Sequence, residues 1–169
     1  MASLVMTIGL IALAQLCVIS IHANQVARRT TVATVLAWQK LEQLQSLMFK
    51  FDDAGARLSD TTTDTTVVPE RSTSGTGLSP SPAGALVQDT PGYCDFLDAG
   101  GRLLGGSVGA APAATAYVRR WSIEPLPSAD ALLMQVSVTP RGMRTSSSDV
   151  RRRHIEETRF VVIKARKSG

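Results

Sequence analysis

The sequence predicts an α+β fold in which one long N-terminal helix packs against a small antiparallel β-sheet. Three observations indicate this fold. An apolar run over residues 4–21 continues as a helical pattern to about residue 51, without a proline. A loop rich in Thr, Ser, Gly and Pro follows over residues 52–92, and strand-like alternation occupies parts of residues 93–169. The chain of 169 residues therefore divides into a helix, a long loop and one small sheet domain.

The first part of the helix, over about residues 4–21, has the composition of a membrane span. Apart from the thiol of Cys17, no side chain from residue 1 to residue 21 is ionisable. Roughly 18 residues at a rise of about 1.5 Å give about 27 Å of helix, close to the hydrocarbon core of a bilayer at about 30 Å. The residues expected to form this apolar surface are Leu4, Val5, Ile8, Gly9, Leu10, Ile11, Leu13, Leu16 and Ile19.

Two other interpretations of the apolar run agree less well with its residues. A cleaved signal peptide needs a basic start and small residues at its cleavage site, whereas no Lys or Arg precedes this run and Ile21 stands two residues before Ala23. A core helix normally has a polar face, whereas Thr7 is the only polar side chain between Leu4 and Ala14. A membrane anchor is therefore favoured.

Residues 22–51 form the amphipathic second part of the predicted helix. Spacings of 4, 3, 4 and 3 place five apolar residues on one stripe: Ala37, Leu41, Leu44, Met48 and Phe51. Four polar residues lie largely outside the stripe: Gln39, Lys40, Gln43 and Lys50. Residues 52–55 (Asp-Asp-Ala-Gly) are expected to end the helix. The whole helix would be about 70 Å long, and its stripe is expected to cover one face of the sheet.

Residues 52–92 are too poor in apolar side chains to build a core. Scattered apolar residues such as Val67, Val68 and Leu78 interrupt segments of Thr, Ser, Gly and Pro. We expect a long loop with one or two short elements of secondary structure. A plain flexible linker and a partner-binding loop are equally open interpretations of this segment.

Residues 93–169 contain the patterns that predict β-strands. Residues 93–104 predict two short strands around an Asp-Ala-Gly-Gly turn. Residues 117–123, 132–139 and 158–167 predict three further strands, and the short links favour an antiparallel meander. The sheet residues expected to pack against the helical stripe are Trp121, Met134 and Val136.

Residues of catalytic type are sparse and scattered along the chain. Cys17 and Cys94 lie in different parts of the sequence, as do His22 and His154, so no metal-binding or catalytic spacing is present. No serine stands in a nucleophile-elbow motif or beside a recognisable base. We therefore expect no enzyme activity, no catalytic residue, no metal site and no cofactor.

Two groups of charged residues admit a ligand interpretation. Asp95 and Asp98 invite a calcium site, but two carboxylates without the spacing of a calcium loop favour a turn. Arg119-Arg120 and residues 151–154 (Arg-Arg-Arg-His) invite contact with nucleic acid, but no aromatic ladder accompanies them, and solvated loops are favoured. The net charge of +4 permits an acidic partner without requiring one.

Residues 3–14 (Ser-Leu-Val-Met-Thr-Ile-Gly-Leu-Ile-Ala-Leu-Ala) form an apolar stretch that continues through Ala33 and Ala37 to residues 40–44 (Lys-Leu-Glu-Gln-Leu). This run resembles the prepilin-type segment of type IV pilins and type II secretion pseudopilins, particularly minor pilins of the pilus-modification type. The segments YVRRWSIEPLP and LLMQVSVT resemble the C-terminal sheet of the same proteins. The resemblance covers about fifty residues well and the remainder loosely.

The resemblance implies a pilin-like fold and a non-enzymatic structural subunit, of the minor kind, in a type IV pilus or a type II secretion pseudopilus. The apolar helix would first lie in the bacterial inner membrane, with a periplasmic domain, and then pack in the core of an extracellular or periplasmic filament. Gly9 would allow close approach between helices there. The implied partners are other pilin or pseudopilin subunits, the inner-membrane assembly machinery and the lipid bilayer.

Two features of the family have no counterpart in this sequence. Family members carry a basic leader that ends in Gly before Phe or Met, and a Glu five residues into the mature helix. If Ile8-Gly9 aligns with the Ile-Gly pair of the family, the Glu falls upstream of Met1, so we expect the true start to lie upstream. Arg28 and Arg29 alone would place the C-terminal side of the span in the cytoplasm. Basic residues in an upstream leader would counter this effect on the orientation of the span. A subunit without the Glu, at the tip of a filament, is the rival account.

Two other functions are considered beside the filament subunit. The first is a single-pass membrane protein with a periplasmic β-rich binding domain and no filament role. The second is a secreted enzyme with a mature N-terminus near Asn24. The sequence favours neither a type IV pilus nor a secretion pseudopilus over the other.

Overall fold

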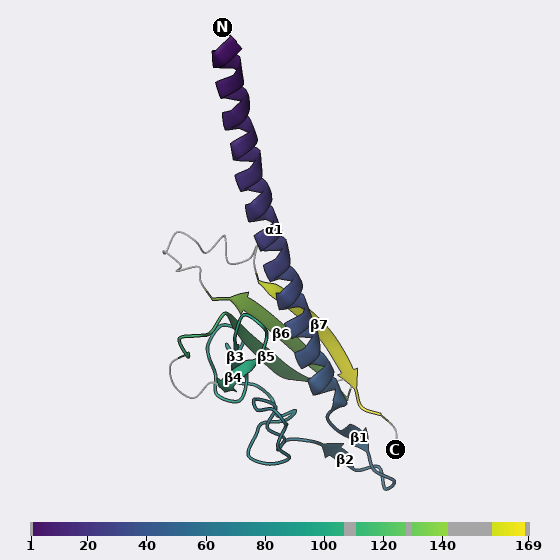
Figure 1. Ribbon diagram of the computed structural model, residues 1–169. Coiled ribbons are helices and arrows are strands. Elements are labelled where there is room, and N and C mark those ends of the chain that lie inside the picture. Colours follow the sequence, from purple (N-terminus) through teal and green to yellow (C-terminus); the bar gives the residue numbers. More distant parts are fainter. Residues whose placement is uncertain (1, 107–110, 128–129, 142–156, 168–169) are drawn as a thin grey trace. The chain divides into compact units, whose positions relative to one another are not determined.

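The computed structural model describes residues 2–106, 111–127, 130–141 and 157–167. Within helix α1 (Ala2–Ser46), the side chains of residues 2–5, 7–9, 11 and 12 lie outside this description. The chain divides into two compact units, Met1–Val32 and Ala33–Gly169. Helix α1 forms the first unit and the beginning of the second, and every strand belongs to the second unit (Figure 1).

The first unit consists of the N-terminal part of α1, where the described large apolar side chains are exposed. The exposed fractions range from 58% to 70% for Met6, Leu10, Leu13, Leu16, Val18, Ile19 and Ile21. Within the described residues, no helix combines the length and the mean hydropathy that crossing a membrane requires. The span predicted over residues 4–21 is therefore not confirmed, and it stays a prediction from the sequence.

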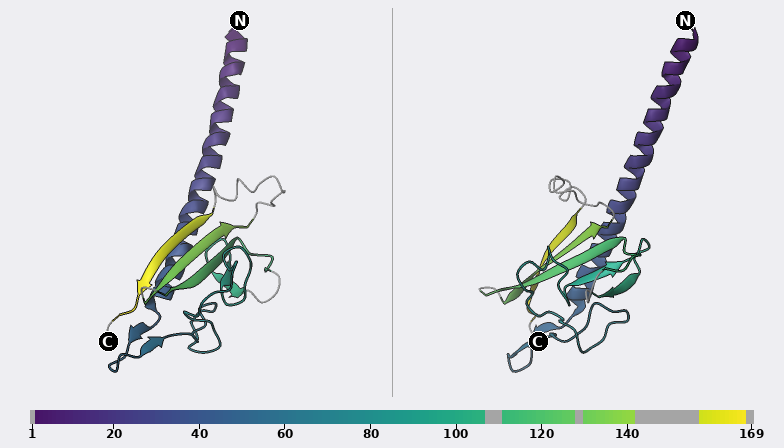
Figure 2. Two further views of the ribbon diagram at one scale, coloured as in Figure 1. Left: turned by 180° about the vertical axis from the view of Figure 1, so that it is seen from behind. Right: turned by 90° about the vertical axis from the view of Figure 1, so that its left-hand side faces the viewer.

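Among the described residues, seven strands follow α1 in the second unit. β1 (Phe49–Phe51) and β2 (Arg57–Ser59) form an antiparallel hairpin. The other strands form one antiparallel sheet in the order β4-β3-β5-β6-β7 (Figures 1 and 2). Their bounds are β3 (Cys94–Leu97), β4 (Leu103–Gly106), β5 (Tyr117–Leu126), β6 (Ala131–Pro140) and β7 (Thr158–Ala165). The predicted α+β fold with an antiparallel sheet is confirmed.

The face of the sheet toward α1 carries the core of the second unit. The register of β5 and β6 places Trp121 beside Val136, and both side chains are completely buried. Phe160 of β7 pairs with Val136, and its ring meets Trp38 of α1 edge-on, with 5.8 Å between ring centres. Residues 33–46 of α1 therefore cover this face (Figure 2).

Helix α1 ends at Ser46, earlier than the sequence pattern predicts. The Nζ of Lys164, on β7, donates hydrogen bonds to three carbonyl oxygens at the helix end, those of Leu44 (3.1 Å), Gln45 (2.7 Å) and Leu47. The last carbonyl groups of a helix have no partners within the helix and carry partial negative charge, so an ammonium group there stabilises the end. A residue far along the chain thus stabilises the end of the helix.

The early end of the helix makes part of the predicted stripe wrong. Met48 lies beyond the helix and is 47% exposed, and Phe51 is a half-buried residue of strand β1. Residues 52–55, expected to end the helix, form the turn between β1 and β2. The Oδ1 of Asp52 accepts hydrogen bonds from backbone amides of this turn, and Gly55 adopts a φ of 78°, which glycine tolerates best.

The segment between β2 and β3 contributes to the core, which its composition does not predict. Leu78 and Ala85 are 2% and 1% exposed. The backbone amide of Ser81 donates to the carbonyl oxygen of Ile123 at 2.9 Å, so the segment also bonds β5 directly. Apolar burial and backbone hydrogen bonds together hold this segment, although the spacing of its apolar residues gives no periodic signal in the sequence.

Replacing Lys164 with Met should lower the free energy of unfolding of the second unit by about 2 kcal/mol, since hydrogen bonds to charged groups contribute about 1.5–3 kcal/mol. Urea unfolding of the full chain in detergent, followed by circular dichroism, measures the change. Lys50→Met is the matched control, because Lys50 is exposed on β1 and its replacement should cost less than about 0.5 kcal/mol. Equal losses in the two variants would contradict the role of Lys164.

Candidate functional site

The residues predicted to form the apolar helix surface lie in the first unit. Four of them have described side chains, and all four are exposed: Leu10, Leu13, Leu16 and Ile19. The other five lie outside the described side chains: Leu4, Val5, Ile8, Gly9 and Ile11. Exposed apolar side chains of this size and number are unfavourable in water.

The residues predicted to join the helix to the sheet lie in the second unit. Six of them are completely buried: Ala37, Leu41, Leu44, Trp121, Met134 and Val136. Met48 and Phe51 do not belong to this contact, because the helix has already ended. The buried face is also wider than the predicted stripe, since Ala33 and Leu36 are at most 3% exposed. A helix that lies flat on a sheet buries a broad face rather than a single line of residues.

A buried ion cluster joins α1, β3 and β5. The guanidinium group of Arg119 holds the carboxylate of Asp95 with two hydrogen bonds, from Nε to Oδ1 at 3.0 Å and from Nη2 to Oδ2 at 2.8 Å. Its Nη1 donates to the carbonyl oxygen of Leu36 at 2.9 Å. The Nζ of Lys40 lies 3.2 Å from Asp95 Oδ2, and both of these side chains are completely buried.

Lys40 makes further contacts that compensate for its burial. Its Nζ donates to the carbonyl oxygen of Thr65 at 2.6 Å and to Oε1 of Gln43 at 3.0 Å. The same atom lies 3.7 Å from the centre of the Trp121 ring, which places the ammonium group over the aromatic face. Burial lowers the pKa of Lys40 to about 8, although the carboxylate of Asp95 acts in the opposite direction.

The sequence pattern misplaces Lys40, because it treats lysine as a residue of the solvent face. Lys40 stands four residues after Leu36 and four before Leu44, and both of these are buried. Residues at this spacing share one face of a helix. The position of Lys40 therefore contained the signal, and the buried carboxylate of Asp95 explains why a lysine is tolerated there.

The adjacent residues Arg119 and Arg120 have separate carboxylate partners, so the predicted solvated pair is wrong. Successive side chains of a strand point to opposite faces of the sheet, and Arg119 points toward α1. On the other face, Arg120 donates from Nε and Nη2 to Oδ1 of Asp89, at 2.9 Å and 2.6 Å. The second basic group, at residues 151–154, lies outside the described residues.

The two carboxylates considered for calcium also have separate roles. Asp95 is engaged by Arg119, while Oδ1 of Asp98 accepts hydrogen bonds from the amides of Gly100 at 2.8 Å and Arg102 at 2.9 Å. The second pattern closes the turn between β3 and β4. Within the described part of the chain, no group of three or more His, Cys, Asp or Glu side chains is arranged to hold a metal ion.

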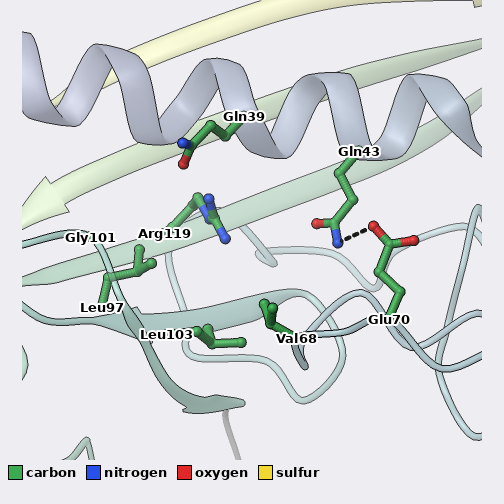
Figure 3. A pocket seen from close by; sticks show the side chains of 8 residues that line it. All are labelled: Gln39, Gln43, Val68, Glu70, Leu97, Gly101, Leu103 and Arg119. Atoms are coloured by element: carbon green, nitrogen blue, oxygen red, sulfur yellow. Dashed lines mark hydrogen bonds between the residues drawn. The ribbon is translucent and has the colours of Figure 1, made fainter.

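A cavity of about 260 Å³ lies beside the ion cluster, between α1, the segment at residues 68–70 and the β3–β4 hairpin (Figure 3). Gln43 donates from Nε2 to Oε1 of Glu70 at 2.6 Å, and this pair borders the cavity. Arg119 lies across the cavity from Gln39 in Figure 3. The lining residues are Gln39, Gln43, Val68, Glu70, Leu97, Gly101, Leu103 and Arg119.

The two cysteines differ in environment. Cys94 is completely buried on β3, and burial together with the carboxylate of Asp89 raises the pKa of its thiol to about 12. A thiol with this pKa is protonated at neutral pH and is a poor nucleophile. Cys17 is exposed on the apolar helix of the first unit, where an introduced oxidant can reach it.

The structure thus presents an exposed apolar helix in the first unit, and an ion cluster with an adjoining cavity in the second. Comparison with protein-family models, with curated proteins and with solved structures gives no match. Function is therefore inferred from the residues and their arrangement alone.

Replacing Asp95 with Asn should lower the free energy of unfolding by about 3–5 kcal/mol, because Lys40 and Arg119 would remain buried as uncompensated cations. Replacing Lys40 with Met should cost less, at most about 2 kcal/mol, since Arg119 still neutralises Asp95 and no buried charge is left without a partner. Urea unfolding of both variants measures the difference. A larger loss for Lys40→Met than for Asp95→Asn would contradict the pairing described above.

Lys40 also predicts the pH dependence of stability. Its pKa is about 8 in the folded chain against an ordinary value of 10.5, so between these values the unfolded chain binds more protons. Stability rises with pH wherever the unfolded state binds more protons, so Lys40 makes the free energy of unfolding increase from about pH 8 to pH 10. The increase should be smaller in Lys40→Met, where Lys164 still contributes with the same sign. Identical slopes for Lys40→Met and the unchanged chain would show that the amine of Lys40 titrates normally.

Proposed function

We propose that this chain is a non-enzymatic structural subunit of a type IV pilus or a type II secretion pseudopilus. The observation that carries the proposal is the single helix Ala2–Ser46, whose environment changes along its length. In the first unit its described large apolar side chains are exposed, and in the second unit its last turns are buried on an antiparallel sheet. The resemblance of residues 3–14 to prepilin-type segments supports the same function.

The proposed mechanism uses the apolar helix twice. Before assembly, residues 4–21 lie in the inner membrane, where uncharged side chains are favoured. During assembly the same side chains leave the lipid and are buried against the helices of neighbouring subunits. Little burial energy is lost in the exchange, because one apolar environment replaces another. The ion cluster keeps the second part of the helix fixed on the sheet while the first part moves.

Two further aspects of the proposal depend on the sequence. The basic domain, the modest length and the resemblance to the pilus-modification type favour a minor subunit over a major one. Subunits of type IV pili and of secretion pseudopili both combine an apolar N-terminal helix with a sheet domain, so the proposal includes both kinds of filament.

The alternative is a single-pass membrane protein whose periplasmic domain binds a partner and forms no filament. The cavity between α1 and the β3–β4 hairpin favours this alternative, because it offers both polar and apolar lining groups. The two proposals differ in what surrounds the apolar helix. In a filament it contacts other subunits, whereas in a solitary membrane protein it contacts only lipid.

Replacing Leu13 with Asp should abolish incorporation into filaments. An aspartate near the centre of a span costs about 2.5–3.5 kcal/mol during membrane insertion, and it would be equally unfavourable in a helical core. Gln25→Asp introduces the same charge beyond the apolar run and should leave incorporation unchanged. Immunoblots of sheared filaments from the native host measure the outcome. Normal incorporation of Leu13→Asp would refute an apolar assembly surface.

Oxidative crosslinking through Cys17 separates the filament subunit from the solitary membrane protein. The exposed thiol should form a disulfide with a neighbouring copy when filaments assemble, and the dimer should disappear in Cys17→Ser. Membranes of the native host, treated with copper phenanthroline and run without reductant, give the measurement. Cys17 that stays monomeric in filament-forming cells would favour the alternative.

A further inference from the structure

Two side-chain features lie at opposite edges of the sheet in the second unit. Trp38 packs beside Phe160 on β7, which is one edge strand of the described sheet. The cavity lies beside β3 and β4, and β4 is the other edge strand. One edge therefore presents a large aromatic side chain, and the other presents a hollow.

Trp38 is poorly buried for a residue of its size. Its side chain is 49% exposed, with one edge against the ring of Phe160, and its Nε1 donates to Oε1 of Glu42 at 2.7 Å. Tryptophan combines a large apolar area with a hydrogen-bond donor, and it is enriched among the residues that dominate protein interfaces. Its packing against Phe160 restricts the ring before docking, so docking would cost less conformational entropy.

The cavity has the size and chemistry of a socket for one side chain. Its volume of about 260 Å³ lies below the range of about 300–1,000 Å³ that is usual for small-molecule pockets. Leu97 and Leu103 supply apolar walls, Val68 lies exposed at the rim, and Glu70 and Arg119 supply an anion and a cation. An aromatic ring with one N–H group matches this set, because the carboxylate accepts the N–H and the guanidinium group faces the ring.

We propose, building on the filament function above, that Trp38 of one copy inserts into the cavity of a second copy of this chain. The indole Nε1–H exchanges Glu42 of its own chain for Glu70 of the next, and Arg119 lies against the indole face. Because the two halves of the contact occupy opposite edges of the sheet, each copy retains a free Trp38 and a free cavity. Such a heterologous contact does not close on a pair and continues from copy to copy. Copies of this chain then occupy successive positions in the filament, whether the chain is a major or a minor subunit.

The test places cysteines beside the two halves of the contact and leaves Trp38 intact. One full-length chain carries Cys17→Ser and Glu42→Cys, and the other carries Cys17→Ser and Val68→Cys, with different tags. Glu42 adjoins Trp38 and Val68 lines the cavity. After coproduction in the native host and oxidation with copper phenanthroline, the mixed disulfide should exceed either self-dimer at least tenfold.

Two controls make the result specific. Val87→Cys replaces Val68→Cys as the matched position, since Val87 is 74% exposed and Val68 is 80% exposed, and it should give no mixed disulfide. Adding Trp38→Ala to the Glu42→Cys chain should lower the yield at least fivefold, while Trp38→Phe should retain more of it. The urea midpoint of each Trp38 variant shows that the second unit still folds. If the Trp38→Ala chain does not fold, the disulfide yields of the Trp38→Phe and Val87→Cys chains decide whether the contact is specific.

The outcomes distinguish this contact from the filament function itself. Chains with Cys17 intact and no other change report helix assembly through the Cys17 disulfide. If that disulfide forms but the Glu42→Cys and Val68→Cys chains give no mixed dimer, the Trp38 contact is overturned and the filament function stands. If the Cys17 disulfide is absent as well, both are overturned. Self-dimers of Glu42→Cys that equal the mixed dimer would indicate a symmetric pair and overturn the contact.

Discussion

The contact between Arg119 and Asp95 is the interaction on which the second unit depends. Two parallel hydrogen bonds join neighbouring strands, and the remaining donors of Arg119 reach the backbone of α1 at Leu36. Lys40 then brings the helix to the same carboxylate from its own side. Because buried charges are tolerated only when paired, the helix can rest on the sheet in the one register that places Lys40 over Asp95.

Helix α1 is one element with two chemical characters. Its N-terminal part exposes apolar side chains and contains no charge up to residue 21, while its C-terminal part buries apolar side chains and a paired lysine. A soluble domain would be expected to bury apolar side chains such as those on the N-terminal part of α1. The uncharged run ends at residue 21, whereas burial of the helix begins at Ala33, where the chain divides into its two units. This difference in burial is the physical basis for proposing that the first unit makes the membrane and filament contacts.

The two edges of the sheet are chemically different, and this difference bears on assembly. The β7 edge is bordered by exposed apolar groups, among them Trp38, Val161 and Ile163. The β4 edge is bordered by the cavity and its charged groups. A domain whose two sides differ in this way is suited to contacts that repeat in one direction. The ion cluster adjoins the β4 side, because Arg119 belongs to the cluster and lines the cavity as well.

The sequence by itself determined the long helix, the loop and the antiparallel strands. Their signals are local: helical spacing over residues 22–51, of which the helix takes up only residues 22–46, a lack of apolar residues after residue 52, and alternation in residues 117–123 and 132–139. The tertiary structure alone decided the end of the helix at Ser46, the burial of Lys40 and the separation of Arg119 from Arg120. Each of these depends on a partner distant in the chain, namely Lys164, Asp95 and Asp89. Periodicity reports which face of an element is apolar, but it cannot report which charge will find a counter-charge once the elements meet.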